Sequence, residues 1–177
     1  MIVVDTNVLS ELCRERPDRE VLRWYSAQRA SDLFTTTITR GEMVYGVLIK
    51  APGKKRNLLE KQVNDILQIS FQGRQLPFNE TAADAYAALR ANAKSLGRPV
   101  QVPDAMIAAI AWVYGADVAT RNVGDFAALG IGIINPFDST GDQCHEDNSP
   151  TTAAIRNGRG NSVRDGASSP TYQYRMN

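Results

Sequence analysis

The stretch IVVDTNVLSEL, residues 2–12, changes from a β pattern to a helical pattern at a single aspartate. Ile2–Val4 is a run of β-formers, whereas Val8 and Leu9 begin an apolar pattern with helical spacing. Asp5 can therefore cap the helix that follows it. If the strand lies in a parallel sheet, Asp5 instead reaches the crevice at the carboxyl edge, where α/β proteins bind ligands. The choice depends on whether other carboxylates reach the same edge.

Strand and helix patterns alternate along residues 1–138, which predicts one α/β domain around a central, mainly parallel sheet. We expect strands at 2–4, 33–36, 75–78, 117–120 and 132–134. We expect helices at about 7–14, 19–29, 40–50, 55–70, 80–96 and 104–114, with a short turn of helix at 125–129.

The composition is that of an ordinary globular domain: 43% of the 177 residues are hydrophobic and 22% are charged. A net charge of +1 excludes a global basic field, so any contact with nucleic acid must depend on a local patch. The two cysteines indicate neither a disulfide framework nor a zinc cluster. The sequence has no leader pattern and no apolar stretch of membrane-spanning length, so we expect a cytoplasmic protein without membrane contact.

Residues 139–177 differ in character from the rest of the chain. They are mostly small or polar, and their large aliphatic side chains are Ile155, Val163 and Met176. So little apolar surface cannot offset the entropy of ordering, and we expect a disordered C-terminal tail. The tail contains the only histidine, His145, so we expect no histidine chemistry in the domain.

Three further carboxylates stand near the starts of helices. Each has a structural interpretation: Thr39 and Glu42 fit a capping box, Asp104 complements a helix dipole, and Asp125 suits the N-cap of a short apolar turn. They also share a second property. In a parallel sheet, Glu42 and the segment containing Asn122 reach the same edge as the first strand's aspartate, and Asp104 joins them if its helix is a crossover helix.

Converging carboxylates repel one another and raise one another's pKa unless a cation lies among them. Oxygen ligands without cysteine or histidine select a hard cation, so the sequence favours Mg²⁺, for which Mn²⁺ can substitute. An acidic crevice would bind a polyanion through basic residues at its rim. The candidates are Arg14, Arg16, Arg40, Arg98, Arg121 and the run of Lys54, Lys55 and Arg56. Each of these residues, taken singly, is better explained as a solvated surface charge.

Five segments carry a family resemblance: IVVDTNVLSEL (2–12), the helix of Glu42, NETAADAYAALRANAKSLGRPV (79–100), PDAMIAAIAWVYGADVATRNVGDF (103–126) and INPF (134–137). Together they resemble the PIN-domain ribonucleases, in particular the VapC/FitB-like toxins of bacterial toxin–antitoxin pairs. The resemblance covers residues 1–138. It implies a three-layer α/β/α sandwich, a magnesium-dependent endoribonuclease acting on single-stranded RNA, a cognate antitoxin that blocks the site, and a homodimer.

The resemblance also implies roles for individual residues. Asp5, Glu42 and Asp104 match the acidic active-site positions, and Asp5 and Asp104 are the surest metal ligands. Thr6 and Thr120 match small hydroxyl positions beside the site.

The sequence departs from the family pattern at Asn122, which stands where many relatives carry a fourth aspartate. The nearby Asp125 is the carboxylate that can replace it. This departure keeps an alternative open, a PIN-like binding module that is weakened in catalysis and acts through its antitoxin. A phosphatase of the haloacid-dehalogenase type is disfavoured, because it needs a second aspartate two residues after Asp5, where Asn7 stands.

Overall fold

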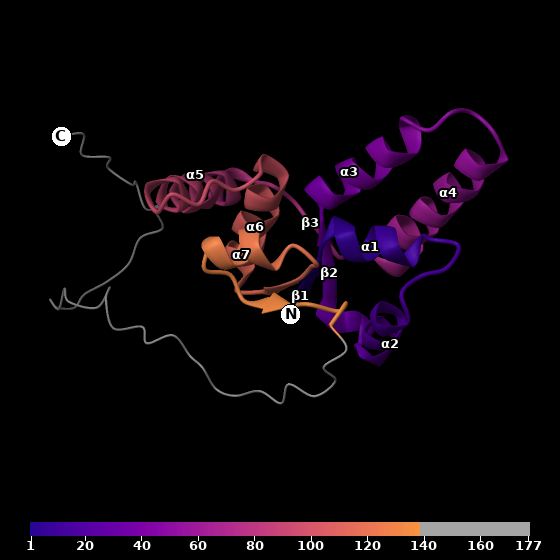
Figure 1. Ribbon diagram of the computed structural model, residues 1–177, viewed down its shortest axis with the longest axis horizontal. Coiled ribbons are helices and arrows are strands. Elements are labelled where there is room, and N and C mark those ends of the chain that lie inside the picture. The colour runs from indigo at the N-terminus through magenta and orange to yellow at the C-terminus, as the bar shows by residue number, and fades with distance from the viewer. Residues whose placement is uncertain (139–177) are drawn as a thin grey trace, which may run out of the picture. The chain divides into compact units, whose positions relative to one another are not determined.

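A parallel five-stranded sheet forms the centre of residues 1–138, the part of the chain that the computed structural model describes (Figure 1). Its strands are β1 (Ile2–Val4), β2 (Leu33–Thr36), β3 (Gln75–Leu76), β4 (Asp117–Ala119) and β5 (Ile133–Ile134). They lie in the order β3-β2-β1-β4-β5, and every neighbouring pair is parallel. The predicted strands and the parallel sheet are confirmed.

Helices connect the strands: α1 (Thr6–Leu12), α2 (Arg19–Ala27), α3 (Thr37–Leu48), α4 (Lys54–Asp65), α5 (Glu80–Ser95), α6 (Val102–Tyr114) and α7 (Val123–Ala128). A short 3₁₀ turn, Ala30–Asp32, precedes β2. The predicted helix over 55–70 changes at its end to a π-helical turn, Ile66–Ser70, in which the Phe71 N–H donates to the Ile66 carbonyl.

Two hydrophobic cores lie on opposite faces of the sheet, because successive residues of a strand point to opposite sides. Val3 and Val118 contribute to the core covered by α5, α6 and α7. Val4 and Ala119 contribute to the core covered by α1, α2, α3 and α4. Figure 1 shows these two groups of helices on either side of the strands. The predicted three-layer α/β/α sandwich is therefore confirmed.

The strand register brings several polar residues to one edge of the sheet. Val4 of β1 pairs with Ala119 of β4, and the Asp5 N–H donates to the Ala119 carbonyl at 3.0 Å. Asp5 and Thr120 thus leave neighbouring parallel strands side by side. The strand order turns back at β1, and in open α/β sheets the crevice beyond such a reversal is where ligands bind.

Helix α3 is capped differently from the sequence prediction. Thr36, the last residue of β2, is the N-cap, and its side-chain oxygen accepts a hydrogen bond from the Thr39 N–H at 3.0 Å. The capping box of Thr39 and Glu42 is therefore wrong. The extended backbone of Thr36 suits a cap at the point where the strand ends, so the helix begins about one turn earlier than expected. Glu42 then lies in the second turn, and its side chain is released from capping.

No helix within residues 1–138 combines the length and the apolar character that a bilayer span requires. The expectation of a disordered tail concerns residues 139–177, which lie outside the described part of the chain.

The cap of α3 gives a stability prediction. Thr36→Val should lower the free energy of unfolding by about 1–3 kcal/mol, because it leaves the buried Thr39 N–H without its acceptor. Denaturant titration measures the change. Thr81→Val, at an exposed position in the first turn of α5, is the control and should stay within about 0.5 kcal/mol of the parent. Equal losses in the two variants would contradict the assigned cap.

Candidate active site

Asp5 is both a helix cap and the centre of a hydrogen-bonded cluster. Its Oδ1 accepts from the Thr6 N–H at 2.6 Å, and its Oδ2 accepts from the Thr120 hydroxyl at 2.7 Å and from the Asn7 amide at 2.8 Å. Only 1% of the residue is exposed. A buried carboxylate needs such partners, and three donors from two elements hold this one in a single orientation. The two interpretations of Asp5 are therefore compatible.

Asn7 belongs to this cluster, although the sequence analysis considered it only as the residue that disfavours a phosphatase. Its side-chain amide donates to Asp5 and lies 3.3 Å from the Thr120 hydroxyl oxygen, which also accepts from the Asn122 N–H at 3.0 Å. The sequence could have indicated this role of Asn7, because a short polar side chain two residues after a helix-capping aspartate can hydrogen-bond back to the cap.

Glu42 reaches the same cluster from α3. The Thr6 hydroxyl donates to Glu42 Oε2 at 2.5 Å, and the Thr6 N–H donates to Asp5 Oδ1. The first turn of α1 therefore connects two carboxylates. Burial raises the pKa of Glu42, the hydrogen bond from Thr6 lowers it, and the charge of Asp5 raises it, with a net upward shift.

The remaining carboxylates face each other at the starts of α6 and α7. The Asn122 amide nitrogen donates to Asp104 Oδ2 at 2.6 Å and to Asp125 Oδ2 at 2.9 Å, and so bridges the two acids. Asn122 occupies the N-cap position of α7, and Asp125 lies in its first turn. The interpretation of Asp125 as an N-cap is therefore wrong, because the helix begins at Val123.

Asp104 is the carboxyl group most affected by these surroundings. Its pKa rises from the usual 3.8 to about 7. Burial contributes most, the charge of Asp5 comes next, and a hydrogen bond to Asp125 and the charge of that residue add to the rise, while the hydrogen bond from Asn122 opposes it. Asp104 thus interacts electrostatically with carboxylates from β1 and α7 across the edge of the sheet.

We call Asp5, Glu42, Asp104 and Asp125 the acidic group. Within residues 1–138 no three of the Asp, Glu, His and Cys side chains already form a metal cage, and neutral donors link the acidic group instead. Burial contributes most to the raised pKa values of Glu42 and Asp104, and the charge of Asp5 adds to both shifts; a cation would relieve this added repulsion. The atoms that would bind a metal ion are carboxylate oxygens, which Mg²⁺ and Mn²⁺ prefer as ligands, so the residues fit such an ion.

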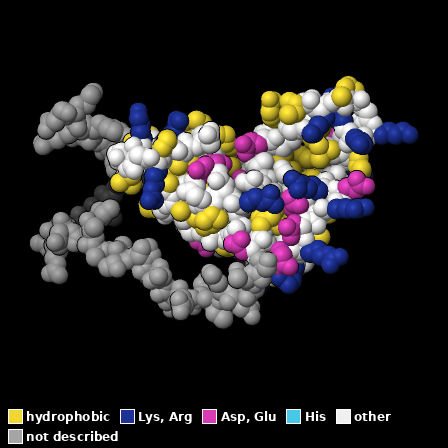
Figure 2. All heavy atoms as spheres, in the orientation of Figure 1, with side chains coloured by type: hydrophobic (Ala, Val, Ile, Leu, Met, Phe, Trp, Pro, Cys, Tyr) yellow, Lys and Arg dark blue, Asp and Glu magenta, His cyan; other side chains and the backbone are white. Residues whose placement is uncertain are grey.

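The predicted basic residues occupy different surroundings. Arg40 lies on α3 and donates to the Gln75 side chain at 3.3 Å, whereas Arg98 is exposed beyond the end of α5. Arg121 stands between Thr120 and Asn122, both of which bind acidic-group residues. Figure 2 shows basic side chains next to acidic ones in the middle of the face in view. Of the three arginines, Arg121 is the one placed directly in a segment of the site.

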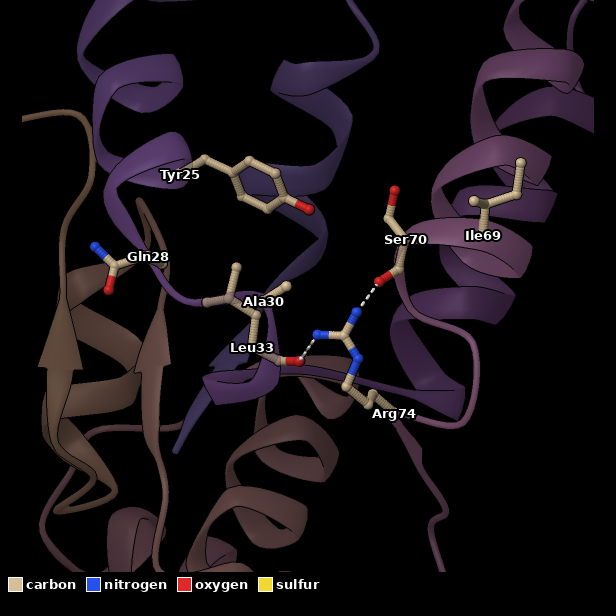
Figure 3. Close-up of a pocket in the computed structure, with 7 residues that line it drawn as sticks. All are labelled: Tyr25, Gln28, Ala30, Leu33, Ile69, Ser70 and Arg74. Atoms are coloured by element: carbon tan, nitrogen blue, oxygen red, sulfur yellow. Dashed lines mark hydrogen bonds between the residues drawn. The ribbon is translucent and has the colours of Figure 1, made fainter.

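A pocket of about 340 Å³ lies away from the acidic group (Figure 3). Its lining includes Tyr25, Leu33 at the start of β2, and Arg74 just before β3, which places it at the amino edge of the sheet. The Arg74 guanidinium donates to the carbonyls of Leu33, at 3.0 Å, and Ser70. These bonds occupy the pocket's basic group, and its lining holds no carboxylate.

Comparisons with known proteins are consistent with this arrangement. The PIN domain model matches residues 2–131. The chain is 41% identical to "VapC ribonuclease Y4jK" of Sinorhizobium fredii over 138 residues, 78% of this chain and 99% of that protein. It is 37% identical to "Toxin FitB" of Neisseria gonorrhoeae over 137 residues, 77% of this chain and 99% of that protein. A solved structure of FitAB bound to a DNA fragment matches with a TM-score of 0.75 and 37% identity, covering 80% of this chain and 99% of that one.

The raised pKa of Asp104 predicts a pH-dependent stability. Because the folded-state pKa of about 7 lies above the usual 3.8, the folded protein binds this proton more tightly, and its stability should fall as pH rises between these values. Asp104→Asn removes the titration and keeps an acceptor for Asn122. In buffer with chelator, the variant should melt above the parent at about pH 8, and the difference should vanish near pH 4.

Thermal midpoints measured across this pH range test the prediction. Asp117→Asn, at an exposed position on β4, is the matched control and should follow the parent at every pH. A difference between Asp104→Asn and the parent that does not change with pH would contradict the assigned cause.

Proposed function

Because the chain belongs to the PIN-domain family, among its VapC- and FitB-type toxins, we propose that it is a metal-dependent endoribonuclease. It hydrolyses phosphodiester bonds of single-stranded RNA and acts as the toxin of a toxin–antitoxin pair. The observation that carries the proposal is the acidic group, in which the charge of Asp5, just after β1, acts on Glu42 of α3 and on Asp104 of α6.

Asp5 and Asp104 would hold Mg²⁺, with Glu42 as a further ligand and Mn²⁺ as a substitute. When bound, the ion lowers the pKa of a water molecule and stabilises the negative charge that develops on the phosphate. The protein's own part is to fix the carboxylates beforehand. Thr6, Asn7 and Thr120 orient Asp5, and Thr6 also orients Glu42, so little reorganisation is needed when substrate arrives.

RNA carries the same charge sign as the acidic group, so binding requires both the cation and basic residues at the rim. Arg121 is the best-placed of these, and Arg98, which is exposed, can contact a longer RNA. Arg40 is held by Gln75, so a contact with RNA would require it to leave that partner.

The proposed protein partners are a cognate antitoxin and a second copy of this chain, and the proposed location is the cytoplasm. An antitoxin segment that offers arginine or lysine to the acidic group would supply the positive charge that the carboxylates need and would exclude RNA.

A second candidate function follows from Asn122. Its neutral amide donates to Asp104 and Asp125 at a position where an aspartate would add a further negative charge. A site with less negative charge binds a divalent cation less tightly. On this alternative, the protein is a catalytically weakened PIN-like module that acts by binding its antitoxin. Activity measurements separate the two functions.

The endoribonuclease proposal predicts cleavage of single-stranded RNA with Mg²⁺ or Mn²⁺ and none in excess chelator. Asp5→Asn should reduce the cleavage rate by more than about 100-fold. Loss of a residue that only supports a metal ligand costs up to about 100-fold, so a larger loss identifies Asp5 as a ligand. The variant should stay folded at the assay temperature, because asparagine keeps an acceptor for the Thr6 N–H. Its thermal midpoint should fall, because an amide nitrogen then faces the Asn7 and Thr120 donors in place of Oδ2. Asp84→Asn, exposed on α5, is the control and should cleave normally.

A labelled RNA pool separated on a gel gives the rate. Cleavage that persists in chelator would exclude metal dependence. Absence of cleavage with every metal, together with tight antitoxin binding, would favour the binding module.

The bridging amide gives a prediction with a readout other than activity. Asn122→Asp should tighten Mn²⁺ binding by about tenfold, or about 1.4 kcal/mol, because it adds a charged oxygen between Asp104 and Asp125. In chelator the same variant should melt below the parent, because three carboxylates then repel one another. Calorimetric titration and thermal midpoints measure the two effects. Unchanged Mn²⁺ affinity would show that position 122 does not contact the ion.

A further inference from the structure

Glu11, on α1, is a buried carboxylate outside the acidic group. Its side chain is 5% exposed, and its Oε2 lies 3.0 Å from an Arg14 nitrogen and 3.7 Å from an Arg121 nitrogen. Its Oε1 accepts from the Asp18 N–H at 3.0 Å. Burying a carboxylate is costly unless cations and hydrogen bonds compensate it. Glu11 therefore forms ion pairs with two arginines, which lie close together at the surface.

Phe137 holds Arg121 from a second side. The central guanidinium carbon lies 3.8 Å from the centre of the Phe137 ring, well within the range of an attractive cation–π contact. Phe137 follows β5 and packs partly against the core covered by α1 to α4, which fixes the ring. The guanidinium is thus confined between a carboxylate and an aromatic face.

With respect to residues 1–138, Arg121 nevertheless retains hydrogen-bond donors for a ligand. Its side chain is 52% exposed, and the 3.7 Å separation from Glu11 is an ion pair too long for a good hydrogen bond. The flat face of the guanidinium is used by Phe137, whereas its N–H groups point outward in the plane of the ion. These donors can make a bidentate contact with two oxygens of one phosphate.

The local charge favours the same ligand. One carboxylate, Glu11, is shared by Arg14 and Arg121, so this cluster keeps one positive charge. Arg121 is flanked by Thr120, which binds Asp5, and Asn122, which binds Asp104. A surplus positive charge beside the acidic group attracts a backbone phosphate next to the one that would be cleaved.

We infer that Arg121 binds a backbone phosphate of the RNA beside the scissile one, and that Phe137 and Glu11 are positioning residues that hold its guanidinium. This inference rests on the proposed ribonuclease function. A stacked guanidinium has less conformational freedom to lose when the phosphate binds, which is the contribution of Phe137.

The test compares Arg121→Gln, Phe137→Leu and the double variant. Phe137→Leu removes the ring without altering charge. Steady-state cleavage of a single-stranded RNA pool in Mg²⁺ gives KM and kcat. Fluorescence anisotropy across a salt series gives RNA affinity with the acidic group intact and Ca²⁺, which also prefers oxygen ligands, in place of Mg²⁺. A gel run on the same samples checks that the RNA stays intact. Arg121→Lys, which keeps the charge but loses the planar fork, provides a second measurement if Phe137→Leu folds poorly.

Arg121→Gln should raise KM by about tenfold, the scale of one charge-assisted hydrogen bond, with kcat within about twofold of the parent. It should also reduce the slope of log affinity against log salt by about 0.7, the loss of one phosphate contact on a single strand. Arg121→Lys should raise KM and keep the parent's salt slope. Phe137→Leu should raise KM by about threefold, and the double variant should be no worse than Arg121→Gln, because the ring acts through the arginine.

Arg90→Gln is the matched control, because Arg90 also lies over an aromatic ring, that of Tyr86 at 5.6 Å, but on α5. It should leave KM and salt slope unchanged. Additive effects in the double variant, or an unchanged KM in Arg121→Gln, would overturn the inference while the ribonuclease proposal stands. A parent that neither binds nor cleaves the RNA pool would overturn both.

Discussion

The buried carboxylate of Asp5 is the constraint on which the rest of the site depends. A strand that ends at the reversal point of a parallel sheet places its next residue in a crevice, and at 1% exposure that residue must find its hydrogen bonds within the protein. Thr6, Asn7 and Thr120 supply them. Each of these donors also connects to another part of the site, so satisfying one aspartate aligns α1 with the segment after β4.

Like charges at one sheet edge are tolerated because neutral donors separate them. The Thr6 hydroxyl binds Glu42, and the Asn122 amide binds Asp104 and Asp125. Hydrogen bonds from neutral groups reduce the repulsion without removing it, and the pKa of Asp104 remains raised to about 7. At the proposed metal site a divalent cation would relieve this unfavourable charge distribution, and the fold would thereby keep an affinity for the ion.

The sequence predicted the fold and most of the polar residues at the carboxyl edge of the sheet, because both depend on local sequence patterns. Apolar runs bounded by capping residues define both the strands and the helix starts, and in a parallel sheet they also determine which residues emerge at the carboxyl edge. The prediction failed where two local solutions compete: Thr36 and Thr39 both suit an N-cap, and only the strand's end point selects Thr36. Glu11 and Phe137 could not be found this way, because their roles depend on Arg121, more than a hundred positions from Glu11 in the chain.

Asn122 holds two carboxylates in place with a neutral group. An aspartate at the same place could accept hydrogen bonds but could not donate to Asp104 and Asp125, so the three acids would need a cation to stay together. The amide removes that need, since its nitrogen binds both carboxylates at 2.6 and 2.9 Å. The start of α7 therefore keeps its position beside α6 without a metal. Because Arg121 and Thr120 precede this point, the same amide also steadies the backbone of Arg121, the residue proposed to bind a phosphate. A residue that weakens the site's charge thereby preserves the alignment between the acidic group and its basic rim.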